Sequence, residues 1–210
     1  MTGPRILIVY ATHYGQTGKV ARFVADCLTK HGGDVTLLNA NELPRHTTLP
    51  HGKTPSSYDA VIVGASIVFG RHQRAIARFV TKHRDALNAM PTAFISVSDS
   101  AATQLDPTHA HAHSAVDTFL RTTGWHPGRV ELVGGALAFT KYNPVLRFVM
   151  KRISASEGGP TDTSRSYEFT DWEALGRFAD AFAASLPQVP VSRATPPRPV
   201  PPAPGPLISA

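Results

Sequence analysis

Cysteine is almost absent from the sequence. Cys27 is the single cysteine among 210 residues, which excludes a disulfide within the chain. It falls on the apolar side of an expected helix, so we expect a buried thiol rather than a redox centre. No stretch approaches the roughly 18 apolar residues of a membrane span, and the first residues lack the layout of a signal peptide. These absences predict a cytoplasmic protein, either free in solution or peripheral on the inner face of the cell membrane.

Acidic side chains are also few, since 15 Asp and Glu stand against 21 Lys and Arg and give a net charge of +6. A small electron shuttle that docks on basic partners is expected to be acidic, and this chain is the opposite. The positive charge favours anionic small molecules or anionic lipid head groups. Nucleic acid is disfavoured as a partner, because no compact run of Arg and Lys is interleaved with aromatic residues.

The chain alternates between apolar stretches and amphipathic segments. Residues 5–11 (RILIVYA) form a continuous apolar run, which is typical of a strand buried on both faces. Further strands are expected at 34–40, 60–66, 92–98 and 130–137, and helices at 20–28, 76–83, 116–120 and 170–186. This alternation predicts an α/β fold with a doubly wound, five-stranded parallel sheet. Ligands of such sheets lie beyond the carboxyl ends of the strands, here at 12–17, 66–72 and 98–108.

Two segments fall outside this alternation. Residues 138–169 separate the fifth strand from the last helix and are far longer than an ordinary connection. We interpret them as an insertion that splits the last strand, with the strand resuming at 166–170. Residues 190–210 contain eight prolines and no aromatic residue. This composition predicts a disordered Pro-rich tail after a single domain at 1–189.

The loop THYGQT at 12–17 carries the clearest chemical pattern. A nucleotide-hydrolase loop is excluded, because His13 stands where such a loop needs Gly and Val20 where it needs Ser or Thr. No Gly-x-Gly-x-x-Gly run for a dinucleotide follows the first strand. Threonine hydroxyls and backbone amides around Gly15, at a helix N-terminus, suit one phosphate monoester without a metal. An ordinary strand-to-helix turn is the alternative that the hexapeptide alone leaves open.

Three histidines, His109, His111 and His113, alternate with alanine. Alternate side chains share a face only in an extended segment, whereas helical metal sites prefer a spacing of four residues. Asp106 is the one further ligand nearby. We therefore predict no metal site and an exposed loop before the third helix.

Residues 144–153 of the insertion (PVLRFVMKRI) combine apolar side chains with three cations, after a proline that suits a helix start. A short basic amphipathic helix can lie in a lipid interface, cover a pocket or pack on the core. The candidates for contact with an anionic substrate or a membrane are Arg147, Phe148, Lys151 and Arg152. Packing on the core is the alternative.

Several short motifs occur in one unbroken order over about residues 4–187. They are YGQT at 14–17, GASIVFG at 64–70, MPTAFISV at 90–97, GAL at 135–137, GGPTDT at 158–163 and TDWE at 170–173. Together they resemble the flavodoxin-like, menaquinone-dependent protoporphyrinogen IX dehydrogenases of bacterial haem synthesis. Each motif is weak alone, and their combination is specific.

This resemblance implies an enzyme that uses FMN to oxidise protoporphyrinogen IX to protoporphyrin IX and passes the electrons to menaquinone or another membrane quinone. The cofactor-binding residues that it implies are Thr12, His13, Tyr14, Gly15, Gln16 and Thr17 at the phosphate, Ser66, Ile67, Val68, Phe69 and Gly70 on one side of the flavin ring, and Ser96, Val97 and Ser98 on the other. It assigns no acid–base residue, so solvent or the nitrogens of the substrate are expected to handle the protons.

Three features depart from the family pattern. Tyr14 stands where flavodoxins often have Thr or Ser, which removes one hydroxyl from the phosphate loop and leaves its backbone N–H. The loop at 98–108 has no aromatic residue to stack on the flavin, which leaves Phe69 for that role on the other face. Residues 101–113 lack the Arg and Lys that the family carries there.

Two other functions remain open at this point. One is a different FMN-dependent quinone reductase or a flavodoxin-type electron carrier, and the other is a non-catalytic flavodoxin-fold module that binds partners. The positive charge and the insertion argue against a plain carrier. The intact phosphate loop argues against a mere binding module.

Overall fold

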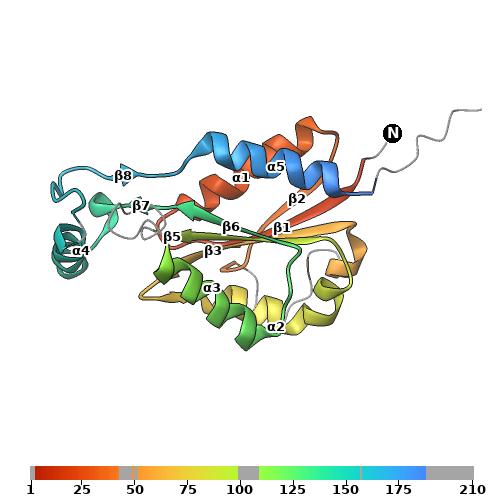
Figure 1. Cartoon of the computed structure of the whole chain (residues 1–210), viewed down its shortest axis with the longest axis horizontal. Coiled ribbons are helices and arrows are strands. Elements are labelled where there is room, and N and C mark those ends of the chain that lie inside the picture. The colour runs from red at the N-terminus through yellow and green to blue at the C-terminus, as the bar shows by residue number, and fades with distance from the viewer. Residues whose placement is uncertain (1–2, 43–48, 50–51, 99–108, 157, 188–210) are drawn as a thin grey trace, which may run out of the picture.

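The structure is a computed structural model that describes residues 3–42, 49, 52–98, 109–156 and 158–187. Its centre is a sheet of parallel strands in the order β2-β1-β3-β5-β6 (Figure 1). These strands are β1 (Arg5–Ala11), β2 (Asp34–Asn39), β3 (Ala60–Val68), β5 (Thr92–Ser98) and β6 (Arg129–Gly134). The short β4 (Arg71–His72) pairs antiparallel with the end of β3. The predicted five-stranded parallel sheet is confirmed.

Four helices cover the two faces of this sheet, and Figure 1 shows one pair above it and one pair below. They are α1 (Gln16–Lys30), α2 (Arg74–Asn88), α3 (Ala110–Thr123) and α5 (Trp172–Ser185). Side chains alternate along β1: Ile6 and Ile8 pack with α1 and α5, while Leu7 and Val9 pack with α2 and α3. Because both faces are buried, the strands read as continuous apolar runs.

The strand order places a ligand crevice at the carboxyl end of β1. The chain passes from β1 to β2 on one side and then returns to β3 on the other, so β1 lies between the two. At such a reversal the loops that follow neighbouring strands diverge and leave a crevice between them. The phosphate loop at 12–17 and the end of β3 therefore meet at one edge of the sheet.

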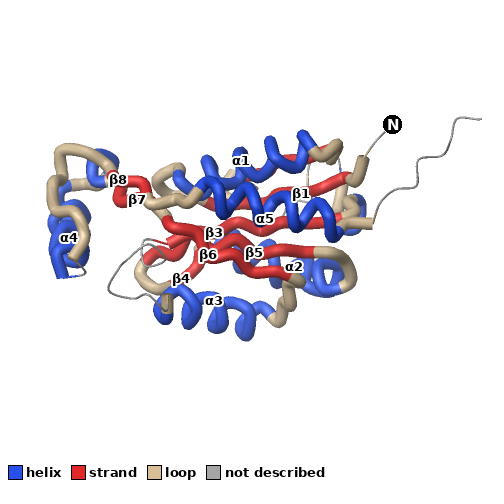
Figure 2. The backbone as a smooth tube through the Cα atoms, turned by 45° about the horizontal axis from the view of Figure 1, so that its top comes forward, coloured by secondary structure: helices blue, strands red, loops and turns tan. Residues whose placement is uncertain are grey.

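The insertion lies beyond that edge, away from the rest of the molecule in two views (Figures 1 and 2). Its elements are β7 (Ala136–Leu137), the 3-10 helix η4 (Phe139–Lys141), α4 (Pro144–Ser156) and β8 (Tyr167–Glu168). A short strand, β8, does form within the predicted segment 166–170. The predicted resumption of the last strand is nevertheless wrong, because β8 pairs antiparallel with β7 in a separate two-stranded sheet and does not extend the parallel sheet. The two short strands thus close the base of the insertion.

The insertion has a small core of its own. Phe139 is fully buried there, and Tyr142 packs against it with ring centroids 5.9 Å apart. The Tyr142 hydroxyl accepts a hydrogen bond from the backbone N–H of Ala138 at 3.1 Å. Leu146 and Met150 of α4 pack on this cluster from one side. The helix is therefore held by an apolar stripe on a local core rather than by the main sheet.

Two sequence predictions need correction. The expected single strand at 130–137 is wrong, because the chain breaks at Gly135 into β6 and β7. The expected loop at 109–113 is also wrong, because α3 begins at Ala110 and includes His111 and His113. Alanine favours helix strongly, and Ala112 is buried against the core. This packing extends the helix towards its N-terminus.

Other predictions concern smaller elements or fall outside the described residues. The 3-10 helix η2 (Pro55–Ser57) precedes β3 and was not predicted. Cys27 is half-buried against the core beside α5, and burial raises the pKa of its thiol. Residues 99–108 of the predicted loop at 98–108, and the predicted Pro-rich tail at 190–210, lie outside the residues that the structure describes.

Candidate functional site

The phosphate loop at 12–17 turns sharply at Gly15. The backbone of Gly15 has a φ of 101° at the N-cap of α1, a conformation that side-chain-bearing residues rarely adopt. Its N–H donates to the Thr12 hydroxyl at 2.9 Å, which closes the turn. The turn directs the N-terminus of α1, with its free backbone N–H groups, towards the crevice.

Thr17 is buried in the first turn of α1, with an exposed fraction of 1%. Its hydroxyl has no hydrogen-bond partner among the described residues, although Thr17 lines the cleft. A buried polar atom without a partner costs about 1–3 kcal/mol. Such an atom, next to a helix N-terminus and an open glycine turn, fits a phosphate oxygen that accepts its hydrogen bond.

A cleft of about 220 Å³ lies between this loop, the ends of β3 and β5, and the insertion. Most of the cofactor-binding residues implied by the resemblance line it. They are Thr12, His13, Tyr14, Gln16, Thr17, Ser66, Ile67, Val68, Phe69, Val97 and Ser98. The structure thus brings three separate loops of the sequence together at one site.

Phe69 stands at the tip of the hairpin between β3 and β4. Phe69 and Gly70 have φ values of 48° and 72°, and together they form the two-residue turn between Val68 and Arg71. Positive φ at both central positions matches the twist of such a hairpin. Gly70 adopts it without strain, but Phe69 does not. Its ring is nonetheless 75% exposed beside the cleft, an arrangement that suits contact with a ligand rather than the stability of the fold.

Buried polar side chains support these loops from behind. The amide nitrogen of Gln73 contacts the Ser66 hydroxyl at 2.9 Å and also the Nδ1 atom of His13. Ser96 is fully buried and contacts Nε2 of His72 at 2.9 Å. Burial lowers the pKa of His72 to about 4, so its ring is neutral near pH 7. The loops are therefore joined across the sheet edge by hydrogen bonds between side chains.

Three predicted cofactor residues do not line the cleft. Ser96 contacts His72 in the core, although its neighbours Val97 and Ser98 line the cleft. Gly15 and Gly70 shape the two turns and carry no side chain. The predicted role of each in binding a cofactor stays a prediction.

The insertion supplies cleft residues that the sequence did not identify. Leu146, Met150 and Ile153 of α4 line the cleft at a spacing of one helix face. Tyr142, Gly135 and Ala136 line it as well. The helix carries apolar residues on both of its sides, so the sequence pattern could not show which side faces inward.

The four candidate residues of α4 lie outside the cleft lining. Phe148 is 64% exposed, and Lys151 and Arg152 are exposed too. Arg147 is half-buried and donates through Nε to the Phe139 carbonyl at 3.0 Å and through Nη2 to the Tyr142 carbonyl at 3.1 Å. The hydrogen bonds of Arg147 therefore connect α4 to η4. Lys151 and Arg152 remain as the exposed cations of this helix.

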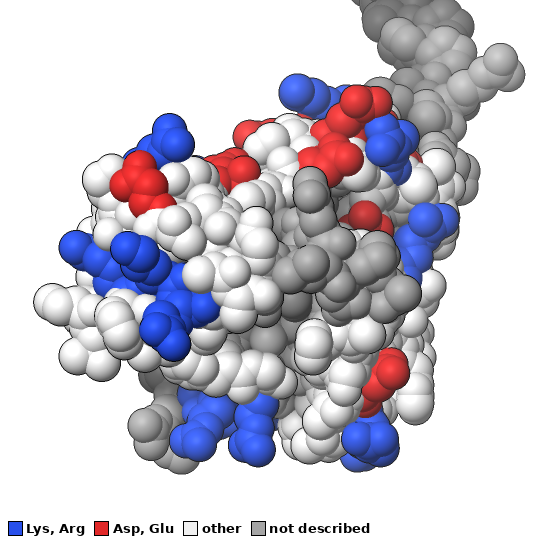
Figure 3. All heavy atoms as spheres, turned by 60° about the vertical axis from the view of Figure 1, so that its left-hand side comes forward, with Lys and Arg blue, Asp and Glu red and all other residues white. Residues whose placement is uncertain are grey.

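Lys and Arg gather on this end of the molecule, among uncharged surface (Figure 3). Val145 and Val149 of α4 add to the exposed apolar area beside Phe148. None of the described helices is long and apolar enough to cross a membrane. Within the described ranges, no cluster of three or more His, Cys, Asp or Glu residues is arranged for a metal.

Comparison with known proteins agrees with this geometry. The family model of the flavodoxin domain matches residues 7–164. Among solved structures, oxidised flavodoxin 1 from Bacillus cereus has a TM-score of 0.52 at 15% identity, covering 87% of this chain and 99% of that chain. This likeness confirms the fold, and the family match indicates a flavin site.

Two relatives belong to the enzyme family that the sequence motifs indicated. Protoporphyrinogen IX dehydrogenase (quinone) of Escherichia coli is 34% identical over 85% of this chain and 94% of its own length. The protein of the same name from Leishmania major is 32% identical over 93% of this chain and 79% of its own length. This chain therefore belongs to the flavodoxin-domain family of protoporphyrinogen IX dehydrogenases.

Proposed function

We propose that this protein uses FMN to oxidise protoporphyrinogen IX to protoporphyrin IX and passes the electrons to menaquinone or a similar membrane quinone. The observation that carries the proposal is the extent of the likeness to the Escherichia coli relative. It spans 94% of that protein, so it includes the insertion as well as the flavodoxin domain. A plain flavodoxin-type carrier does not account for a cleft that is partly lined by an insertion.

FMN fits the phosphate loop better than a dinucleotide does. Thr17 offers a buried hydroxyl without a partner among the described residues, and Gly15 leaves its turn open to a close approach. These groups suit one terminal phosphate at the N-terminus of α1. The sequence carries no dinucleotide fingerprint after β1. When bound, the flavin ring accepts a hydride from a carbon donor and returns electrons to a quinone.

The rest of the cleft suits a large apolar substrate next to that ring. Hydride transfer requires close contact, so the macrocycle must lie against the flavin. Leu146 and Met150 on the side of the insertion offer apolar contacts to the macrocycle, whereas Phe69 on the other side is left for the flavin ring. Leu146 and Met150 would orient the macrocycle and exclude water. We assign proton transfer to no side chain among the residues that the structure describes.

The outer face of α4 is suited to the propionates of the substrate or to a lipid surface. Lys151 and Arg152 provide positive charge beside the exposed Phe148. A quinone resides in the bilayer, so a peripheral contact there would shorten its path to the cleft. Anionic head groups would also attract the basic end of the molecule that Figure 3 shows.

The test is an anaerobic assay of the purified FMN-loaded protein with protoporphyrinogen IX and a menaquinone analogue. Formation of fluorescent protoporphyrin that depends on both FMN and the quinone is the expected result. Quinone reduction with another donor, but none with protoporphyrinogen, would instead identify a different flavin-dependent quinone reductase. A protein that binds FMN and turns over with neither donor would be a binding module.

A further inference from the structure

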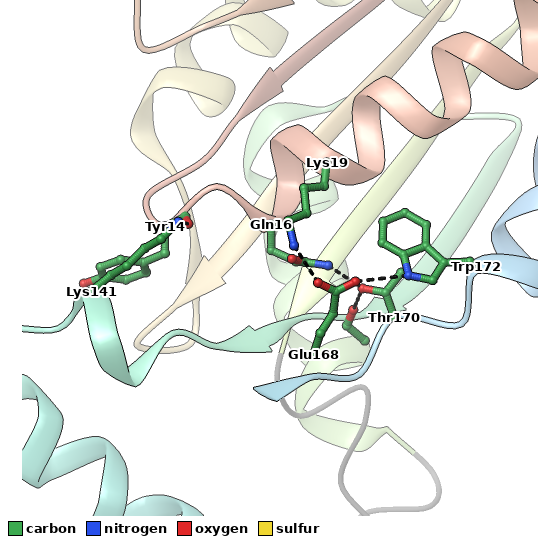
Figure 4. A network of polar contacts seen from close by, with 8 residues as sticks. Tyr14, Gln16, Lys19, Lys141, Glu168, Thr170 and Trp172 are labelled. Atoms are coloured by element: carbon green, nitrogen blue, oxygen red, sulfur yellow. Dashed lines mark hydrogen bonds and ion pairs between the residues drawn. The ribbon is translucent and has the colours of Figure 1, made fainter. Parts of the chain in front are cut away.

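The two ends of the insertion both reach the phosphate loop (Figure 4). Lys141, at the end of η4, contacts the loop at Tyr14. At the other end, Glu168 and Thr170 contact the first turn of α1 through Lys19 and Gln16. The partners in these contacts lie between 127 and 154 residues apart in the sequence. The loop is therefore held by tertiary contacts to the insertion as well as by its own turn.

Lys141 lies directly over the glycine turn. Its ammonium donates to the Tyr14 carbonyl at 2.7 Å. It also lies 3.4 Å from the point that a Cβ on Gly15 would occupy, and among the described residues beyond the neighbouring backbone no other atom lies within 4 Å of that point. The ammonium thus stands beside the open face of the turn at the N-terminus of α1.

The charge of Lys141 is not balanced by the contact that it makes. The Tyr14 carbonyl is neutral, and within the described ranges no carboxylate forms an ion pair with Lys141. Lys19, the lysine of α1 nearest the loop, pairs with Glu168 at 2.7 Å. The first turn of α1 contains no acidic residue. The loop therefore lies in a positive field and contains a donor, the Thr17 hydroxyl, that lacks a partner among the described residues.

We infer that Lys141 is a further ligand of the phosphate monoester at loop 12–17, so that the insertion closes over the cofactor phosphate. This inference rests on the proposed binding of FMN. An ammonium that contacts only a carbonyl gains a stronger, charge-assisted partner when a phosphate enters the turn. The contact joins the cofactor site to η4 and, through the Arg147 hydrogen bonds, to α4.

Hydrogen bonds at the other end of the insertion hold that end against the first turn of α1, whether or not Lys141 contacts a phosphate. Gln16 donates to the Thr170 hydroxyl at 2.7 Å, and that hydroxyl donates to the Gly134 carbonyl at 2.7 Å. Glu168 accepts from Lys19 and, at 3.0 Å, from the Trp172 indole. The Lys19 ammonium lowers the pKa of Glu168. These bonds do not need a phosphate, so we assign them to the fixed base and Lys141 to the part that responds.

Binding that involves Lys141 must be reciprocal. If the phosphate strengthens the contact between η4 and the loop, then an ordered insertion strengthens phosphate binding by the same factor. FMN should therefore order α4, which lines the substrate side of the cleft, whereas riboflavin should not. Binding of the cofactor phosphate would then order α4 over the cleft before the substrate binds.

The decisive variant is Lys141→Gln, which keeps a donor for the Tyr14 carbonyl and removes the charge. Flavin fluorescence titrations would give the Kd for FMN and for riboflavin, which lacks the phosphate. We expect FMN binding to weaken about tenfold, as for a lost charge-assisted hydrogen bond, with riboflavin binding unchanged. Lys151→Gln, on the exposed face of the same insertion, is the matched control and should change neither Kd.

A second readout follows the insertion itself. Limited trypsin digestion of the wild type at the lysine and arginine residues of α4 should slow when FMN is present and not when riboflavin is present. In Lys141→Gln this protection by FMN should be lost. Thermal unfolding of the flavin-free proteins should show the same midpoint for the variant and the wild type.

Each result bears on one proposal. Equal weakening of FMN and riboflavin would mean that Lys141 shapes the loop, and would overturn its role as a phosphate ligand. Unchanged FMN affinity in Lys141→Gln, together with weakened affinity in Thr17→Val, would also overturn it but leave the FMN site intact. Failure of the wild type to bind FMN under any condition would overturn the proposed function itself.

Discussion

The two sides of the cleft are built in different ways. The side formed by the sheet consists of strand ends whose positions follow from the parallel order β2-β1-β3-β5-β6, and its loops are supported by buried side chains such as Gln73 and His72. The side formed by the insertion rests on a small core around Phe139 and on a few polar contacts to the phosphate loop. The comparison teaches that the two sides of the cleft are stabilised by different contacts, and that the Lys141 contact is where we propose that they are coupled. Substitutions away from that contact should affect one side and not the other.

The largest expected effect is a loss of stability at low pH, caused by His72 on the sheet side of the cleft. His72 packs against both Phe94 and Phe119, with ring centroids 5.0 Å from each, and burial lowers its pKa from 6.5 to about 4. The unfolded chain then takes up the proton first, so the free energy of unfolding falls as the pH drops from 6.5 to about 4. The total loss is about 3 kcal/mol. Denaturant melts at several pH values would measure it.

The matched variant for this prediction is His72→Gln, which retains a donor for Ser96 but does not titrate. Its stability should fall less steeply than that of the wild type over the same pH window. If the free energy of unfolding depended on pH equally in the two proteins, His72 would not be the acid-sensitive group. The acid-sensitive group would then have to be sought elsewhere in the protein.

The next effect concerns the turn that the two sides share. Gly15→Val forces a branched side chain into a φ of 101°, so the loop must leave its binding conformation. Such strain is worth about 1–3 kcal/mol, and FMN affinity should fall roughly 10- to 100-fold. Gly32→Val is the control, because Gly32 has a φ of 84° at the far end of α1 and open space around it. It should lower stability to a similar extent and leave FMN affinity unchanged.

Thr17→Val should change stability and binding in opposite directions. The substitution preserves shape and removes a buried hydroxyl that has no partner among the described residues. The flavin-free protein should become more stable by about 1 kcal/mol, while FMN binding should weaken about tenfold. Calorimetry of the flavin-free protein and a fluorescence titration would measure the two. A variant that is less stable and binds FMN normally would show that the hydroxyl has a structural partner instead.

The smallest effect compares two exposed phenylalanines, one on each side. Phe69→Gly removes an aromatic ring and relieves a φ of 48°, so the free energy of unfolding should rise by about 0.5–1 kcal/mol and flavin affinity should fall. Phe148→Ala on the outer face of α4 should leave flavin affinity unchanged and reduce sedimentation with anionic lipid vesicles. If Phe148→Ala weakened flavin binding as much as Phe69→Gly, the separation between the two sides would be lost.

The fold and the sheet side of the cleft could be predicted because their signals are local. Continuous apolar runs identified β1, β3 and β5, and the parallel order then required the loops at 12–17 and 66–70 to meet. The turn at 12–17 could be predicted because Gly15 stands between Thr12 and Thr17, and its role in binding a phosphate stays a prediction. Even so, Ser96 was expected at the ligand, and its burial against His72 depends on which face of β5 the side chain occupies.

The insertion side could not be predicted to the same depth. Lys141 and Tyr14 are 127 residues apart, and nothing in either local sequence indicates that they touch. The sequence suggested that Arg147 is available to a substrate or a membrane, like Arg152. In the structure the Arg147 guanidinium donates hydrogen bonds to the carbonyls of Phe139 and Tyr142. Because α4 has apolar residues on both sides, the sequence pattern did not show that Leu146, Met150 and Ile153 face the cleft. These features depend on tertiary packing rather than on pattern.

The central claim is that flavin and porphyrinogen meet in one cleft, and a single anaerobic mixing experiment tests it most directly. FMN-loaded protein would be mixed with protoporphyrinogen IX in the absence of quinone, and the visible absorbance of the oxidised flavin followed together with porphyrin fluorescence. The account predicts that the flavin absorbance is lost in the absence of quinone and that a menaquinone analogue restores it. Because conversion to protoporphyrin removes six electrons and one flavin accepts two, porphyrin fluorescence should grow only when the quinone allows repeated turnover. A flavin that stays oxidised in the presence of excess protoporphyrinogen would contradict the account.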